Sequence, residues 1–376
     1  MLAAFRDNKL KAQAAAHRLG LSRARFYKLY ADYLDARAHQ RLQAWTPGLS
    51  GGDHAPVWPP QVEALLRKRL GSKPPASYSF AASETLRLCG YSLDRAQVRR
   101  WAIQNRLAHP RPNHRPQAPV KRWQRSQIGE LWQLDATPHA WFPGAPKLFP
   151  MINMLDDCSR LFVGSKIYEH EQLLAYLDFL PAAFIEYGLP LEIYVDFHSL
   201  FFTHQPHSLT QLGQALHFYG VSFRYAPTPQ AKGIIERSHF FWQERLPAFF
   251  ASEQIDDFDQ ANAQIQSLRL HRNHHELHRE LRMKPQQAWN IALKEKRSVL
   301  RPAPSCPWWP FVWSQRTPVR VAADGRIPIG SQSVRLRARP GTKLILCHHP
   351  SGHHSVLSSQ PDPKSKPLVL FTNRPN

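Results

Sequence analysis

Three acidic residues stand where carboxylates could do chemistry. Asp135 and Asp196 each follow a short run of apolar residues, and Glu236 lies in the first turn of a predicted helix. A carboxylate next to a buried strand is costly to desolvate unless a partner offsets its charge, and a hard divalent cation does this well. We expect Mg²⁺, with two ions about 3.5 to 4 Å apart that activate a water or sugar hydroxyl against a phosphodiester.

Taken singly, each of these acids is better explained as a helix cap or a turn residue. As a set they are not, because Asp135 and Asp196 end strands that are expected to run parallel and to open on the same edge of a sheet. Glu236 follows Asp196 by 40 positions and can reach that edge from its helix. The set therefore predicts one metal-binding site.

The elements that must position these acids alternate from Leu131 onwards. Strands are predicted over 131–135, 149–155, 161–168, 191–195 and 221–225, and helices over 171–187, 208–219 and 233–250. Three strands followed by helix, strand, helix, strand and helix predict an α/β sheet in which the last two strands run parallel to the first. A further helical region is expected from 256 to about 296.

The N-terminal residues 9–34 have apolar residues at helical spacing on both sides of a break at 19–22. Gly20 allows a tight turn and Ser22 can cap the second helix. Arg23 and Arg25 would then project from a recognition helix toward DNA. An ordinary helical hairpin is the alternative, which we disfavour because the second helix is basic on the face that packing leaves free.

A second helical unit is predicted from helices over 61–70, 81–88 and 94–101. The last of these has Arg95, Arg99 and Arg100 and again reads as a recognition helix. Residues 107–125 contain four prolines and predict an extended basic linker.

The charge balance points to a polyanionic partner. Lys and Arg number 49 against 28 Asp and Glu, so the formal charge is +21, and nine basic residues but no acidic one lie between Arg95 and Gly129. Such a field concentrates nucleic acid at the surface. No stretch approaches the ~20 apolar residues of a membrane span, and four dispersed cysteines predict neither a zinc ribbon nor a disulfide framework. We therefore expect a cytoplasmic protein without a membrane partner, associated with the nucleoid when bound to DNA.

The C-terminal tail alternates apolar and polar residues in four short runs, 318–322, 326–329, 334–338 and 343–347, which predict a small β barrel or sandwich. Its strands are basic, so contact with DNA is expected. Residues 361–376 are predicted to be poorly ordered.

Four sequence blocks carry a resemblance to a known family. LWQLDATPHAWF, MINMLDDCSRLFVG, YVDFHSLF and APTPQAKGIIERSH occur in the family's order. The stretch from about Leu131 to Trp289 resembles the integrase core of retroviral integrases and of bacterial insertion-sequence transposases with an Asp, Asp, Glu triad. The whole chain is similar to the insertion-sequence group labelled ISNCY. The implied fold class is multidomain, with α-helical helix-turn-helix units, an α/β ribonuclease H-like core and a small C-terminal β barrel.

The resemblance implies that Asp135, Asp196 and Glu236 are the catalytic and metal-binding triad. The implied activity is metal-dependent DNA strand cleavage at element ends, followed by attack of the freed 3′ hydroxyl on target DNA. The implied cofactor is a pair of Mg²⁺ ions, for which Mn²⁺ can substitute. The implied partners are the terminal inverted repeats, target DNA and further copies of the chain. Gln230, Lys232 and Arg237 would contact DNA near the scissile phosphate.

The expected domains are a helix-turn-helix domain over 1–45, a second one over 58–107, a basic linker over 108–127, the catalytic core with its C-terminal helices over 128–296, and the β barrel over 311–360. The chain begins almost inside its first helix-turn-helix, so we expect a misplaced start codon or a truncated element. In the block that contains the second acid, YVDFHSLF, Asp196-Phe197-His198 replaces the Asp-Asn-Gly of many relatives.

Two other groups of residues are weaker candidates. Asp156 and Asp157 are adjacent, so on an extended backbone they point to opposite faces, and we interpret them as turn residues with Asp157 as a cap. The four histidines His271, His274, His275 and His278 share a helix face but have no acidic or cysteine partner at zinc spacing.

Two alternative functions remain for the whole chain. The first is a DNA-binding regulator or transposase relic that does not cut DNA, and the second is a plain ribonuclease H-type nuclease.

Overall fold

The computed structural model describes residues 1–38, 57–108, 124–145, 147–205, 208–227, 232–330 and 332–373. The chain divides into two compact units, Met1–Pro59 and Pro60–Asn376, and each is described by itself. None of the helices within the described ranges is both long and apolar enough to cross a membrane.

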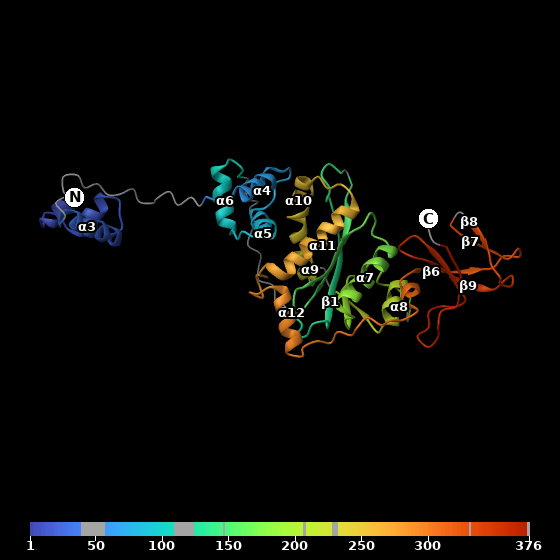
Figure 1. The fold of residues 1–376 in the computed structure, drawn as a ribbon. Helices are drawn as coiled ribbons and strands as arrows, with labels where there is room; N and C mark the ends of the chain where they lie inside the picture. The colour runs from blue at the N-terminus through green and yellow to red at the C-terminus, as the bar shows by residue number, and fades with distance from the viewer. Residues whose placement is uncertain are drawn as a thin grey trace. The chain divides into compact units, whose positions relative to one another are not determined.

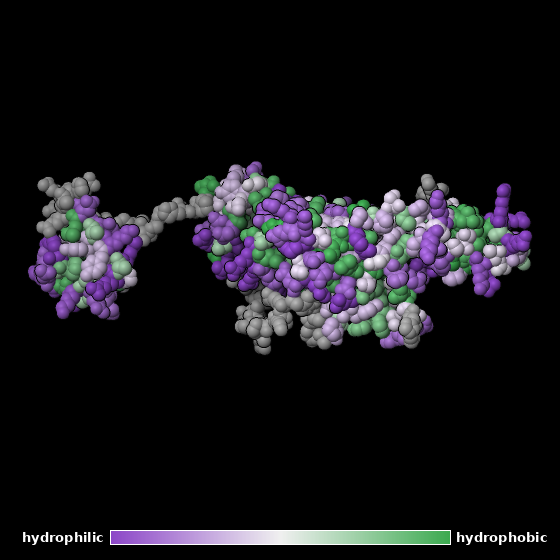
Figure 2. Space-filling view, turned by 90° about the horizontal axis from the view of Figure 1, so that it is seen from below, coloured by the Kyte–Doolittle hydropathy of each residue, from purple (hydrophilic) through white to green (hydrophobic). Residues whose placement is uncertain are grey.

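The N-terminal unit contains α1 (Leu2–Arg6), α2 (Ala12–Arg18) and α3 (Arg23–Ala38). The turn between α2 and α3 lies where the sequence predicts it: Gly20 has φ +66°, and the Ser22 hydroxyl accepts the backbone N–H of Arg25 at 3.3 Å. The core of this unit consists of small residues and one aromatic ring, Ala12, Ala15, Ala16 and Phe26. Figure 2 shows a largely hydrophilic surface around this core.

The second unit begins with α4 (Pro60–Gly71), α5 (Tyr78–Cys89) and α6 (Arg95–Gln104). Asp94 and Gln97 form a capping box that starts α6. These helices pack on the rest of the second unit through Arg69, whose buried guanidinium pairs with Glu84 at 2.8 Å and with Glu253 at 2.5 Å. Because a buried guanidinium without a partner would be costly, these two ion pairs favour the packing of the helices on the core.

The central sheet has the strand order β3-β2-β1-β4-β5. Its strands are β1 (Leu131–His139), β2 (Phe149–Asp156), β3 (Phe162–Ile167), β4 (Glu192–Val195) and β5 (Ser222–Tyr225). β1 is antiparallel to β2 and parallel to β4, and β5 is parallel to β4, which confirms the predicted strand directions. The prediction that Asp135 ends the first strand is wrong, because β1 continues to His139 by pairing with β2, with Asp135 opposite Asn153.

Helices cover both faces of this sheet (Figure 1). One face packs on α7 (Leu173–Tyr187) and α8 (Gln211–Phe218) through Trp132, Leu134 and Phe184. The other face contacts α9 (Gly233–Gln243) and α11 (Phe258–His275), and α12 (Pro285–Lys294) follows.

The single helix predicted over 233–250 is two helices, α9 and α10 (Leu246–Glu253). Pro247 stands in the first turn of α10. A proline is tolerated there but not inside a continuous helix, so the backbone restarts at this point.

The C-terminal region starts with α13 (Trp309–Val312) and contains β6 (Gln315–Arg320), β7 (Arg326–Ile329), β8 (Gln332–Arg335), β9 (Lys343–His348), β10 (His354–Leu357) and β11 (Val369–Asn373). The described strands form a four-stranded sheet, β11-β10-β9-β6, and a two-stranded sheet, β7-β8. Barrel closure stays a prediction. Residues 361–376 were expected to be poorly ordered, which is wrong for β11: it pairs along β10, with Val356 opposite Phe371.

Candidate functional site

The parallel register of β1 and β4 brings two of the predicted acids together. The pairing ends with Gln133 opposite Tyr194. Asp135 lies two residues after Gln133 in β1, and Asp196 lies two residues after Tyr194, directly beyond the end of β4. Because side chains alternate between faces, both acids lie on the face that also holds Tyr194. This is the face against which α9 packs.

Both carboxylates contact one cation of the protein itself. The Nζ atom of Lys232 lies 2.5 Å from Asp135 Oδ1 and 3.3 Å from Asp196 Oδ2. The Lys232 side chain is 7% exposed, whereas that of Asp196 is 48% exposed. A buried ammonium is stable only when paired, so the two acids and Lys232 stabilise each other.

A third contact to Asp135 comes from His239, which we did not predict. Its Nε2 atom lies 3.0 Å from Asp135 Oδ2, and its ring is buried. His239 follows Glu236 by three positions and Lys232, the residue before α9, by seven, so helical spacing places His239 near both along the helix. This spacing is the feature of the sequence from which His239 could have been predicted as a site residue.

Neighbouring contacts hold α9 in this position. Asn153, opposite Asp135 in the sheet, donates to the Ser238 hydroxyl at 2.5 Å and accepts from Ser165 at 2.5 Å. Gln243, at the other end of α9, donates to the Thr137 hydroxyl at 3.1 Å. The helix is therefore attached to β1 and β2 on both sides of His239.

The protonation of Asp135 follows from these neighbours. Burial raises its pKa, but the hydrogen bond with His239 and the positive charge of Lys232 outweigh burial, so the pKa lies below its ordinary value. Asp135 is an anion at neutral pH, which is the form that binds a cation.

Glu236 does not join the two aspartates in this structure. Its side chain is exposed, and among the described residues no hydrogen bond or ion pair involves it. Likewise, no group of three or more His, Cys, Asp or Glu side chains in the described ranges is arranged to hold an ion. On α9 it is His239, one turn further along, that faces Asp135. Asp135 and Asp196 can thus share one cation. The third predicted carboxylate, that of Glu236, lies one helical turn before His239 and does not contact them.

Two curated relatives match the chain. The transposase for insertion sequence IS1202 of Streptococcus pneumoniae is 34% identical over 164 residues, which cover 42% of this chain and 34% of the relative. The "Putative transposase y4bF" of Sinorhizobium fredii (strain NBRC 101917 / NGR234) is 24% identical over 310 residues, 77% of this chain and 66% of the relative. The chain is similar to insertion-sequence transposases. These relatives confirm the resemblance predicted from the motifs, although the chain spans only 34% and 66% of their lengths.

No protein-family model matches the chain. Similar solved structures include the simian T-cell lymphotropic virus intasome in complex with PP2A regulatory subunit B56 gamma, at 14% identity and a TM-score of 0.38 over 70% of this chain and 88% of that one. The catalytic core domain of HTLV-2 integrase in complex with magnesium matches at 17% identity and a TM-score of 0.34, over 44% and 99% of the two chains.

The predicted DNA-contacting residues have different surroundings. Arg23 and Arg25 on α3, and Arg95, Arg99 and Arg100 on α6, are exposed. Arg237 forms an ion pair with Glu280. Lys232, expected to contact DNA, contacts the carboxylates instead, and Gln230 lies outside the described residues, as does most of the basic linker.

Asp156 is the last residue of β2 and Asp157 begins the turn that follows, so the prediction of a turn residue is wrong for Asp156; both side chains are buried. It is Asp156, rather than the predicted Asp157, that caps the turn, because it accepts the backbone N–H and the hydroxyl of Ser159 at 2.8 and 2.7 Å. Asp157 instead pairs with Arg160 at 2.7 Å. Both carboxylates serve the fold.

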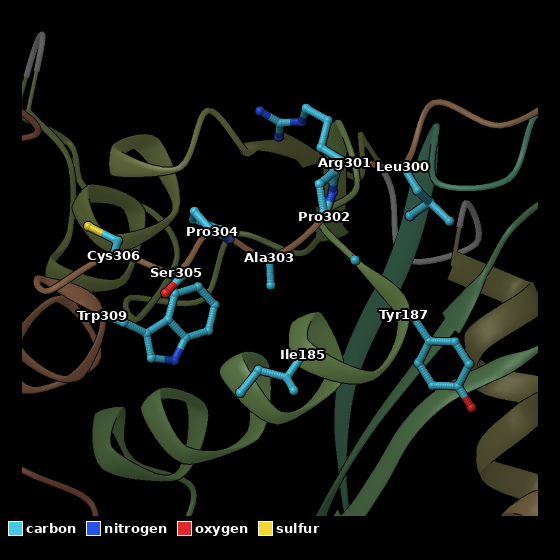
Figure 3. Close-up of a pocket in the computed structure, with 11 residues that line it drawn as sticks. Ile185, Tyr187, Leu300, Arg301, Pro302, Ala303, Pro304, Ser305, Cys306 and Trp309 are labelled. Carbon is cyan, nitrogen blue, oxygen red and sulfur yellow. The ribbon is translucent and has the colours of Figure 1, made fainter.

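A surface hollow of about 660 Å³ lies away from the carboxylates. The end of α7 and the segment from Leu300 to Trp309 line it, with Ile185 and Tyr187 on one side and Ala303 and Trp309 on the other (Figure 3). It contains none of the predicted catalytic residues, so we do not identify it with the site.

Proposed function

We propose that this chain is a transposase that cleaves DNA at the ends of an insertion sequence and transfers the freed 3′ hydroxyl to target DNA. The observation that carries the proposal is the convergence of Asp135 and Asp196 on a single cation, the Lys232 ammonium. Two carboxylates that share one positive charge where the pairing of β1 with β4 ends suit a metal-dependent phosphoryl transfer.

In this proposal Asp135, Asp196 and Glu236 hold Mg²⁺, or Mn²⁺ in its place. The ion would neutralise phosphate charge and activate the attacking oxygen. His239 keeps the Asp135 carboxylate oriented through its hydrogen bond at 3.0 Å. Lys232 must leave the carboxylates, and its ammonium then becomes available to a DNA phosphate. Glu236 joins the aspartates from one turn before His239.

The DNA itself would be held by the basic modules. We propose that α3 with Arg23 and Arg25, and α6 with Arg95, Arg99 and Arg100, read the terminal inverted repeats, and that Gln230 and Arg237 act nearer the scissile phosphate. Two ends must be paired for strand transfer, so the active form is an oligomer of this chain on DNA.

The test uses the full chain and DNA of the element's own ends, obtained by sequencing the flanks of the gene. With Mg²⁺ or Mn²⁺ the wild-type chain should nick the end and join it to target DNA. Asp135→Asn should bind the same DNA and lose both reactions, while Asp259→Asn, at an exposed carboxylate in the first turn of α11, should retain them. Normal binding without any nick by the wild type would overturn the proposal.

A DNA-binding protein that does not cut is the second candidate. The observation that favours it is the separation of Glu236 from the two aspartates. It requires that Asp135→Asn changes neither DNA binding nor any effect on gene expression.

A further inference from the structure

Three aromatic rings lie directly beside Asp196. Phe197 is the next residue, and its ring stacks on Tyr225 with centroids 5.2 Å apart and an interplanar angle of 14°. The Phe202 ring is nearly perpendicular to both, with its centroid 5.1 Å from that of Phe197 and 5.5 Å from that of Tyr225. We call Phe197, Phe202 and Tyr225 the aromatic platform.

The outer ring of the platform is open to solvent. Phe197 is 54% exposed, whereas Phe201, in the same loop, is 4% exposed and packs against Tyr176 and Phe223. The loop therefore buries the side chain of Phe201 and leaves that of Phe197 exposed to solvent. Because Tyr225 stacks on one face of the Phe197 ring, a further planar group would have to stack on the other face.

The platform is attached to the strands that carry the candidate site. Tyr225 pairs with Val195 in the parallel register of β4 and β5, and its hydroxyl donates to the Phe201 carbonyl at 2.9 Å. The Asp196 carboxylate accepts the backbone N–H of His198 at 3.1 Å, which holds the turn that contains Phe197. Phe197 thus has a defined position at the ends of β4 and β5, one residue after Asp196.

A flat, open aromatic face in a chain of charge +21 suits one class of ligand especially well. Nucleobases stack on aromatic side chains while basic residues hold the phosphates, and this needs a base that is not paired within a duplex. We infer that the aromatic platform stacks an unpaired base of the DNA strand that contains the scissile phosphate. This inference rests on the proposed function, since that function places the phosphate at Asp196.

The test is photocrosslinking of the full chain to element-end DNA in which 5-iodouracil replaces each base flanking the scissile phosphate in turn. A stacked ring should give an adduct on Phe197 at one of these positions, identified by mass spectrometry. Phe197→Leu keeps an apolar side chain without a ring, and should lose the adduct and bind ends with unpaired flanking bases about tenfold more weakly. Phe197→Tyr keeps the ring and should retain the affinity.

The outcomes separate this inference from the proposed function. Cleavage by the wild type without an adduct on the platform at any flanking base would overturn the inference alone. An adduct without cleavage would support the platform and overturn the proposed function. If Phe197→Leu instead changes the oligomeric state in sedimentation and leaves DNA affinity as in the wild type, the rings bind a second copy of the chain and the inference is wrong. Unchanged melting temperatures of both variants would show that the fold is intact.

Discussion

The ammonium of Lys232 lies 2.5 Å from the Oδ1 atom of Asp135, in the position where a bound cation would balance the charge of that carboxylate. Lys232 also reaches Asp196, so one ammonium of the chain contacts both carboxylates and offsets part of their charge. The two carboxylates therefore have a counter-ion from the chain itself, and the metal ion of the proposed function would have to compete with it.

Replacing Lys232 should expose this competition. Lys232→Gln leaves Asp135 and Asp196 facing each other without a cation, which should cost about 1 to 2 kcal/mol of the free energy of unfolding without metal. Added Mn²⁺ should then raise the melting temperature of the variant more than that of the wild type, as thermal unfolding with and without the ion can measure. Equal shifts in the two proteins would contradict a shared place for the ammonium and the metal.

His239 should matter for cleavage but not for DNA binding. His239→Ala removes the hydrogen bond that orients Asp135, and such supporting contacts typically contribute about 10- to 100-fold to metal affinity or activity. His239→Gln can still donate to the carboxylate and should recover part of the rate. The measurement is the nicking rate against Mn²⁺ concentration. An alanine variant with the wild-type rate and metal dependence would remove His239 from the site.

The ion pair between Glu276 and Arg245 should make the stability of the fold depend on pH. Burial raises the pKa of Glu276, but the charge of Arg245 and its hydrogen bonds at 2.6 and 2.9 Å outweigh burial and lower the pKa to about 2. A carboxylate whose pKa is lower in the folded state stabilises the fold above its unfolded pKa, and this contribution is lost as pH falls through the folded pKa. Glu276→Gln should therefore cost about 2 to 3 kcal/mol at neutral pH and less toward pH 2. Urea unfolding at several pH values measures this, with Asp259→Asn as the control.

The exposed arginines of α6 should set the affinity for DNA. Each of the variants Arg95→Ala, Arg99→Ala and Arg100→Ala removes one positive charge from the helix surface. If the lost side chain contacts a phosphate, the plot of log affinity against log salt concentration should be less steep, by about one released counter-ion. A variant that loses a base contact should instead discriminate less between the terminal repeat and unrelated DNA. The melting temperature should stay unchanged, because these side chains are exposed. Wild-type affinity and salt dependence in all three variants would exclude α6 as a DNA reader.

Much of the fold was predictable because the chain encodes it locally. Short apolar runs predicted the five strands of the sheet, and the helical crossovers between them predicted that β4 and β5 run parallel to β1. The same reasoning placed Asp135 and Asp196 at one edge. The four short runs after residue 318 were also predictable, but β10 and β11 were not, because such short segments become strands only when β9 and β10 lie beside them.

What the sequence determined by itself is that Asp135 and Asp196 follow apolar runs in strands that run parallel, since the segments between these strands are long enough for helical crossovers. Their register and shared face came from the structure. Only the tertiary structure decided which side chains meet them. The rotation of α9 against the sheet is set by distant contacts such as Ser238 with Asn153 and Gln243 with Thr137. That rotation turns Lys232 and His239 toward Asp135 and leaves Glu236 exposed, and helical spacing alone cannot select among three residues on neighbouring parts of one helix.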